Sequence, residues 1–117
     1  MKTEIPMPEE VETFFWYDGP ILYSAQILGQ LRLVTLIKFG DNESIYMVSS
    51  PSEAQMRDMA ENRVPLRDVS DTGPFYRMTI EDFTMTTCLE EVDGWPEGML
   101  PDPGVLLSLD TTPAQSS

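Results

Sequence analysis

Residues 21–39 read ILYSAQILGQLRLVTLIKF, and this stretch decides the fold. Two apolar-rich runs flank Gly29, which is the pattern of a β-hairpin. A two-residue loop would pair Leu28 with Leu31 and leave both faces of the hairpin mixed. A three-residue loop would pair Ile27 with Leu31 and separate apolar from polar residues. Because a buried face fixes the register of a strand pair, we predict the three-residue loop.

In this register, one face of the hairpin is apolar. It carries Ile21, Tyr23, Ala25, Ile27, Leu31, Leu33, Ile37 and Phe39. The opposite face carries Ser24, Gln26, Arg32 and Lys38 together with Leu22, Leu28, Val34 and Leu36. Since large apolar residues prefer the interior, the second face is expected to be partly covered as well.

The segment before the hairpin, FFWYDGP at residues 14–20, joins an aromatic run to a turn. TFFWY predicts a short strand, and Asp18-Gly19-Pro20 is strong turn chemistry. Successive side chains of a strand point to opposite faces, so we expect one aromatic pair in the core and the other either covered or exposed. Residues 1–12 hold two prolines and four glutamates and predict an N-terminal arm.

After the hairpin, IYMVS at residues 45–49 predicts a third strand, and SPSEAQMRDMAENR at residues 50–63 predicts a helix. Ser50 is the expected N-cap, Pro51 the first helical residue and Glu53 the partner in a capping box. The apolar stripe of this helix consists of Met56, Met59, Ala60 and Val64. The next segment, PLRDVS, is predicted to be a short connector.

The stretch FYRMTIEDFTMTTCL, at residues 75–89, alternates like a strand with one interruption. The phase of the alternation changes at Glu81 and Asp82, which predicts a β-bulge or a tight turn there. A single helical turn capped by Thr79 is the competing interpretation. Residues 90–117 are rich in proline and glycine and predict an irregular tail, with a possible short strand at VLLSL.

These elements predict one α+β domain over residues 13–89. A mainly antiparallel meander of four to five strands would carry one helix, between an arm at residues 1–12 and an acidic tail at residues 90–117. The chain of 117 residues is long enough for an independent core.

The charge balance is strongly acidic. The chain has 20 acidic and 7 basic residues, a net charge of −13. Phosphate backbones and anionic lipids repel such a surface, so we expect neither direct nucleic-acid binding nor membrane binding. A larger protein with a basic surface is the expected partner. The alternative interpretation is that acidity only keeps the protein soluble.

The residue inventory argues against most catalytic chemistry. The chain has no histidine and a single cysteine, Cys88, which excludes Ser-His and Cys-His pairs and an ordinary structural zinc site. No glycine-rich phosphate loop is present. Acid–base or metal chemistry by carboxylates is left, at Glu9-Glu10-Glu12, Glu81-Asp82 and Glu90-Glu91-Asp93. We therefore predict a non-enzymatic protein without cofactor or metal.

The N-terminal segment has no apolar core, and no apolar run reaches the roughly 20 residues of a membrane helix. With only one cysteine, no intrachain disulfide can form, which fits a reducing compartment. A cytoplasmic protein is the expectation.

Binding residues are expected at the aromatic turn and in the acidic tail. The candidates are Tyr17, Asp18, Glu90, Glu91, Asp93 and Trp95. Trp95 lies in the acidic stretch DGWPEG, where a tryptophan anchors the segment either onto its own domain or onto a partner.

The stretch from residue 14 to residue 70 resembles a family of small bacterial domains of uncharacterised function. The matching positions are Tyr17, Asp18, Gly19, Pro20, Ser52, Glu53, Leu66, Arg67 and Asp68, an aromatic-YDGP opening, a helix start and an LRD after the helix. The resemblance implies an α+β domain and no catalytic residue. Residues after 75 match no part of that pattern.

From these observations we expect a non-enzymatic acidic module that binds a basic partner, with an inhibitor, immunity-protein or antitoxin-like role as the sharper form. One alternative is a structural subunit of a homo-oligomer, such as a homodimer, or of a larger assembly. A second alternative is a carboxylate enzyme or metal site.

Overall fold

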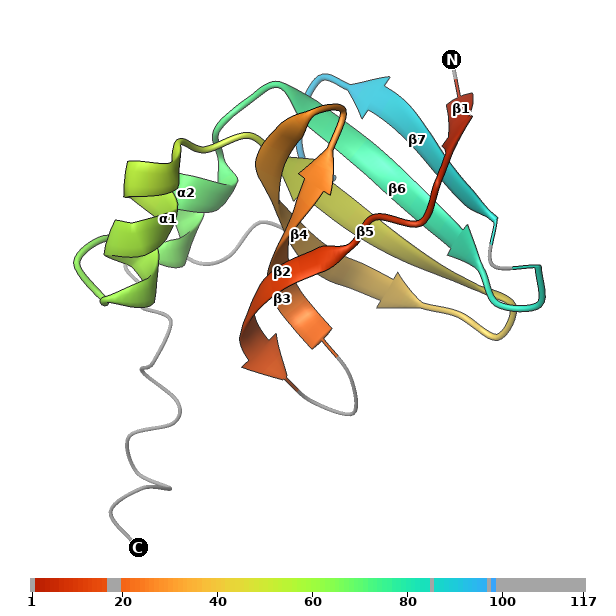
Figure 1. The fold of residues 1–117 in the computed structure, drawn as a ribbon, viewed down its shortest axis with the longest axis horizontal. Coiled ribbons are helices and arrows are strands. Elements are labelled where there is room, and N and C mark those ends of the chain that lie inside the picture. Colours follow the sequence, from red (N-terminus) through yellow and green to blue (C-terminus); the bar gives the residue numbers. More distant parts are fainter. Residues whose placement is uncertain (1, 17–19, 85, 97, 99–117) are drawn as a thin grey trace, which may run out of the picture.

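The computed structural model describes residues 2–16, 20–84, 86–96 and 98, and shows a mostly β domain with two short helices (Figure 1). The strands are β1 (Lys2–Ile5), β2 (Glu10–Trp16), β3 (Pro20–Ile27), β4 (Gln30–Phe39), β5 (Glu43–Ser49), β6 (Phe75–Glu81) and β7 (Thr87–Val92). Helices α1 (Glu53–Ala60) and α2 (Leu66–Ser70) lie between β5 and β6. The predicted α+β class and antiparallel sheet are confirmed, but the sheet has seven strands and carries two helices.

The sheet is a meander from β2 to β7, and β1 joins it at the far edge. Its strand order is β1-β7-β6-β5-β4-β3-β2, and every neighbouring pair is antiparallel. Residues 1–12 therefore contain all of β1 and the start of β2.

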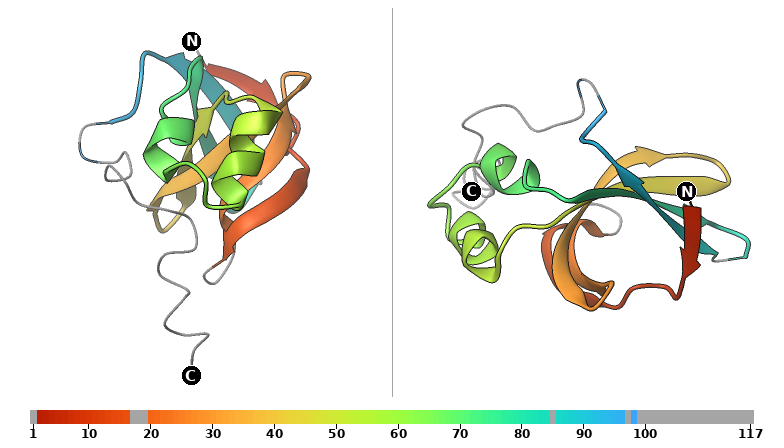
Figure 2. Two further views of the ribbon diagram at one scale, coloured as in Figure 1. Left: turned by 90° about the vertical axis from the view of Figure 1, so that its left-hand side faces the viewer. Right: turned by 90° about the horizontal axis from the view of Figure 1, so that it is seen from above.

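The short connection between the two edge strands forces the sheet to curl. Residues 6–9 join β1 to β2, and a connection of that length spans at most about 17 Å. Six strand spacings in a flat sheet would separate the same edges by about 29 Å. The edges must therefore approach each other, and the right-hand view of Figure 2 shows the sheet curled around its interior.

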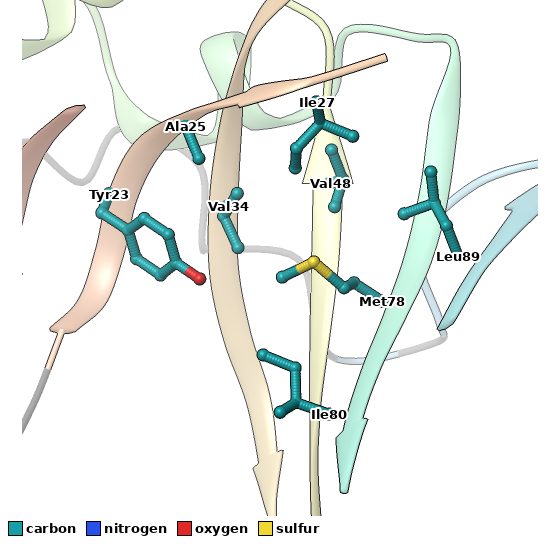
Figure 3. Packing of buried hydrophobic residues seen from close by; sticks show 8 residues of the cluster. All are labelled: Tyr23, Ala25, Ile27, Val34, Val48, Met78, Ile80 and Leu89. Atoms are coloured by element: carbon teal, nitrogen blue, oxygen red, sulfur yellow. The ribbon is translucent and has the colours of Figure 1, made fainter. Parts of the chain in front are cut away.

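The inside of the curl holds the main core (Figure 3). The buried cluster consists of Tyr23, Ala25, Ile27, Val34, Val48, Met78, Ile80 and Leu89. Tyr23 and Tyr46 meet edge to face, with their ring centroids 6.1 Å apart and their planes at 77°. Five neighbouring strands, from β3 to β7, supply this cluster, so the interior depends on all strands of the meander except β2.

A second cluster lies on the outer face of the sheet, under the helices. It consists of Leu22, Leu33, Met56, Met59 and Val69. Phe14, Leu31, Val64 and Leu66 pack against it. The predicted stripe on α1 is thus confirmed at Met56 and Met59. Because β3 and β4 are covered on both faces, apolar residues occur on both.

The predicted hairpin register is wrong. Ile27 pairs with Gln30, so the loop is Leu28-Gly29, and both loop residues have positive φ, 54° and 76°. Two positive φ angles are the mark of a type I′ turn. This register puts Arg32 on the inner face and Leu33 on the outer face. The separation of apolar from polar residues could not decide the register, because both faces of the hairpin are buried.

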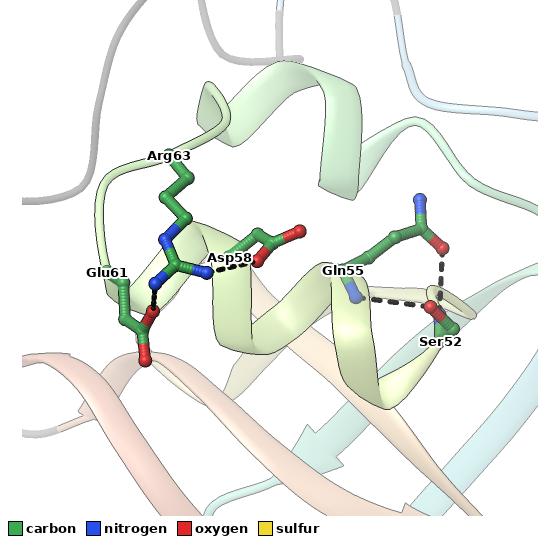
Figure 4. A network of polar contacts seen from close by, with 5 residues as sticks. All are labelled: Ser52, Gln55, Asp58, Glu61 and Arg63. Carbon is green, nitrogen blue, oxygen red and sulfur yellow. Dashed lines mark hydrogen bonds and ion pairs between the residues drawn. The ribbon is translucent and has the colours of Figure 1, made fainter.

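The start of α1 also differs from the prediction. Ser52, not Ser50, is the N-cap: its Oγ accepts from the Gln55 N–H at 3.1 Å, and the Ser52 N–H donates to Gln55 Oε1 at 2.8 Å (Figure 4). Gln55 therefore completes the capping box that was predicted for Glu53. Ser50 instead donates from its Oγ to the Pro74 carbonyl at 2.7 Å. The predicted connector at residues 65–70 contains α2.

The phase change at Glu81 marks a turn between two strands, which was one of the predicted alternatives. β6 ends at Glu81 and β7 begins at Thr87, and the Glu81 N–H donates to the Thr86 carbonyl at 2.9 Å. The predicted tail begins inside β7, which continues to Val92. The possible strand at VLLSL, residues 105–109, lies outside the described residues.

Candidate functional site

Two hairpin ends lie side by side at one end of the sheet. β4 and β6 both neighbour β5, so the β4–β5 loop is adjacent to the β6–β7 loop. The Asp82 N–H donates to the Asn42 carbonyl at 2.8 Å and ties the two loops together. Within the first loop, the Gly40 N–H donates to the Glu43 carbonyl at 2.9 Å. These backbone bonds hold the loops as one surface.

Each of these loops exposes a phenylalanine. Phe39, at the end of β4, is 79% exposed, and Phe83, in the β6–β7 turn, is 87% exposed. Because β4 and β6 flank the same strand, they are two strand spacings apart, about 10 Å. Burial of a large apolar side chain is favourable, so two exposed phenylalanines on joined loops make this surface a candidate for contact with a partner.

Four acidic residues lie on the same two loops as the phenylalanines. We call the set Phe39, Asp41, Glu43, Glu81, Asp82 and Phe83 the tip surface; all six residues are exposed. Glu43 pairs with Glu81 across the β5–β6 ladder, where like charges destabilise the sheet. No ion pair to these four acids occurs among the described residues. Thr84 donates a hydrogen bond to Glu81 Oε2 at 3.2 Å. The tip surface is thus strongly negative.

The charge of Asp82, on the tip surface, acts on Tyr46, which packs against the inner core. Burial raises the pKa of Tyr46, and the carboxylate of Asp82 raises it further, while a hydrogen bond with Ser44 lowers it. A negative charge disfavours the ionised phenol, which explains the direction of the Asp82 effect on the pKa of Tyr46.

The structure describes four of the six predicted binding residues. Tyr17 and Asp18 lie outside the described residues. Glu90 is held in an ion pair by Arg77, its partner across the β6–β7 ladder. Glu91 and Asp93 are exposed at the end of β7.

Trp95 contacts its own domain. The side chain is half-buried, and its Nε1–H donates to the Ser70 carbonyl at the end of α2, at 2.9 Å. Of the two roles that the sequence left open, the structure therefore shows the anchor onto the domain itself.

Sequence reasoning missed Phe39 and Phe83. The pattern of polarity places Phe39 on the apolar face of the hairpin and Phe83 in an alternating strand. The signal that could have found Phe83 is its place between Asp82 and Thr84, at the predicted break. For Phe39, the signal is the Gly40-Asp41 turn that follows it directly.

A groove lies at the helical side of the molecule, between α1 and the outer face of the sheet. Its volume is about 280 Å³. We call it the helix groove; its lining residues are Glu12, Phe14, Ser24, Leu31, Glu53, Met56, Arg57, Ala60 and Glu61. A second, more apolar cleft of about 360 Å³ lies beneath the β1–β2 connection and includes Met7 and Leu28.

In the described part of the chain, no group of three or more histidine, cysteine or acidic side chains is arranged to hold a metal ion. Neither of the two described helices has the length and apolarity to cross a membrane. Comparison of the chain with family models, with curated proteins and with solved structures found no match.

Proposed function

We propose that this protein is a non-enzymatic acidic binding module that docks its tip surface on a basic surface of a larger protein. The observation that supports the proposal is the placement of two exposed phenylalanines, Phe39 and Phe83, among four carboxylates on joined loops. Buried aromatic anchors surrounded by polar residues provide most of the binding energy at protein interfaces.

The charge on the tip surface selects the kind of partner. Carboxylates favour a basic patch, and a net charge of −13 would accelerate the encounter with one. The same carboxylates disfavour contact between two tip surfaces, because Glu43 and Glu81 of each copy would face like charges. The surface therefore supports a hetero-complex better than a symmetric homodimer.

Within this class, an inhibitor, immunity-protein or antitoxin-like role is the sharper form of the proposal. Asp41, Glu43, Glu81 and Asp82 would occupy positions where a nucleic acid places its phosphates. The exposed rings would add apolar contacts that a phosphate backbone lacks. A cytoplasmic location belongs to the same proposal and is supported by the absence of a possible intrachain disulfide.

The test is capture of partners from a lysate of the native host, with mass spectrometry at low and moderate salt. The tagged protein is compared with a Phe39→Ser/Phe83→Ser variant and with a matched Val11→Ser/Leu28→Ser variant. Val11 and Leu28 are also exposed but lie outside the tip surface. We expect a basic protein that is lost with the tip variant, retained with the control, and released as salt rises. Equal capture by all three proteins would overturn the proposal.

A further inference from the structure

The helix groove combines an apolar floor with an acidic rim. Phe14 and Leu31, from the sheet, and Met56, from α1, form the floor. Met56 belongs to the outer core cluster, and the other two residues pack against it. Glu12 and Glu53 stand on the two walls, one on β2 and one at the start of α1, and both are exposed. A ligand in this groove would therefore meet carbon below and carboxylates above.

We propose that the helix groove binds an arginine or lysine side chain of a basic protein segment. Such a side chain has an aliphatic stem that covers apolar surface and a charged head that stays at the rim. The stem would lie on Phe14, Leu31 and Met56, and the head would reach Glu12 and Glu53. The proposed ligand thus matches both parts of the groove.

The volume of the groove supports a single side chain. At about 280 Å³, it lies below the roughly 300–1,000 Å³ of most small-molecule sites. The groove is bounded by one wall from the sheet and one from α1, so it admits a side chain from a segment that crosses above it.

The charges around the groove determine the sign of the charge that a ligand should carry. Glu61 also lines the groove, but its carboxylate is 2.8 Å from Nη2 of Arg63, which partly neutralises it (Figure 4). No ion pair of Glu12 or Glu53 occurs among the described residues. Arg57 adds one positive charge to the lining. Three carboxylates against one guanidinium leave the lining negative, which repels an anion.

The C-terminal segment of the chain is a poor occupant for the same reason. Residues 99–117 contain two aspartates and no lysine or arginine. The proposed ligand therefore belongs to another molecule. α1 and the tip surface lie at opposite ends of the molecule in Figure 1, so the groove is a second contact that does not depend on the tip surface.

A blocked hexa-arginine peptide is the probe, and a hexacitrulline peptide of the same length is the uncharged control. The readout is methyl NMR of the full chain labelled at its methionines. Met56 lines the groove, whereas Met78 lies in the inner core and reports on the integrity of the fold. We expect hexa-arginine to shift the Met56 resonance with saturation and to leave Met78 unchanged. Hexacitrulline is expected to move neither resonance.

Matched variants then locate the binding site. Glu12→Gln and Glu53→Gln should each weaken the binding measured at Met56 by about 2- to 5-fold, the range of an exposed ion pair. Glu43→Gln and Glu81→Gln remove the same charge from the tip surface and should leave this affinity within about 1.5-fold. An unmoved Met56, or equal weakening by groove and tip variants, would overturn the inference. Neither result bears on the tip surface, which the phenylalanine variants test separately.

Discussion

The guanidinium of Arg32 lies over the ring of Tyr76, with its Cζ 5.1 Å from the ring centroid, inside the curled sheet. Arg32 is only 5% exposed. Its Nε donates to the Ile27 carbonyl at 2.9 Å, and its two terminal nitrogens donate to Ser50 Oγ and Gln30 Oε1. No ion pair of Arg32 occurs among the described residues. A ring and three neutral acceptors therefore satisfy this buried charge.

Replacing Arg32 should destabilise the protein, even with lysine. Arg32→Lys removes the planar group that stacks on Tyr76 and donates in three directions at once. We expect a loss of about 2 kcal/mol in the free energy of unfolding, the range for hydrogen bonds to a charged group. Urea unfolding followed by circular dichroism measures it. Tyr76→Phe, which keeps the ring, is the control and should change stability by less than about 0.5 kcal/mol. A lysine variant as stable as the natural protein would contradict the network.

Arg32 also shows why the hairpin register could not be predicted from the pattern of polarity. A pattern argument places arginine on the solvent face, because an exposed charge needs no partner. Here Ile27, Gln30, Ser50 and Tyr76 supply the partners, and two of these four residues lie far from Arg32 in the sequence. The hairpin itself, the helix stripe and the antiparallel sheet were predictable because they depend on local spacing.

The other differences between the predicted and the observed structure also arise from contacts between residues that are far apart in the sequence. β1 pairs with β7, about 85 residues away, and no local signal in the N-terminal segment identifies that partner. The tip surface likewise depends on β4 and β6 lying on either side of β5. The sequence shows the acids of the two loops but not that Asn42 and Asp82 join them.

The turn at Leu28-Gly29 should respond in opposite ways to two substitutions. Leu28 adopts a φ of 54°, which strains a leucine and suits an asparagine. We expect Leu28→Asn to raise the free energy of unfolding by about 0.5–1 kcal/mol. Gly29 has a φ of 76° and open space around its Cα, so Gly29→Ala should lower it by about 1 kcal/mol through backbone strain alone. Chemical denaturation measures both, and the same sign for the two variants would argue against the type I′ turn.

Loss of the Trp95 hydrogen bond should weaken the fold measurably. Trp95→Phe keeps an aromatic ring but removes the N–H that donates to the Ser70 carbonyl, which would keep its bond from Ser49 Oγ at 2.5 Å. We expect a loss of about 0.5–1.5 kcal/mol. Phe83→Ala, at an exposed ring, is the matched control and should stay within about 0.5 kcal/mol. If the two variants unfold at the same urea concentration, the anchor makes no contribution.

Stability should fall as the pH rises above about 10. Burial, then Tyr46, then Glu10 raise the pKa of Tyr23 above its ordinary value of 10.0, and burial also raises that of Tyr46. The unfolded chain then loses these protons at a lower pH than the folded chain. The contribution is therefore fully present below pH 10 and declines above it.

Urea unfolding at several alkaline pH values, compared with Tyr23→Phe, tests this expectation. The variant should show a shallower decline above about pH 10, because one buried phenol no longer titrates. Absorbance of ionised tyrosine gives an independent check: Tyr23 and Tyr46 should ionise late in the native protein. Identical slopes for both proteins would show that Tyr23 is not protected from ionisation.

Replacing Glu43 with lysine should raise the stability of the protein but weaken its binding to a basic partner. This residue faces Glu81 across the ladder, so Glu43→Lys replaces repulsion with attraction and should raise the free energy of unfolding by about 0.2–1 kcal/mol. The gain should shrink as salt is added, since both residues are exposed. The same change puts a positive charge on the tip surface and should weaken capture of a basic partner. Glu4→Lys changes the net charge equally at an exposed position in β1 and is the control. If Glu43→Lys stabilises the fold but binds as Glu4→Lys does, the repulsion at the tip has no part in recognition.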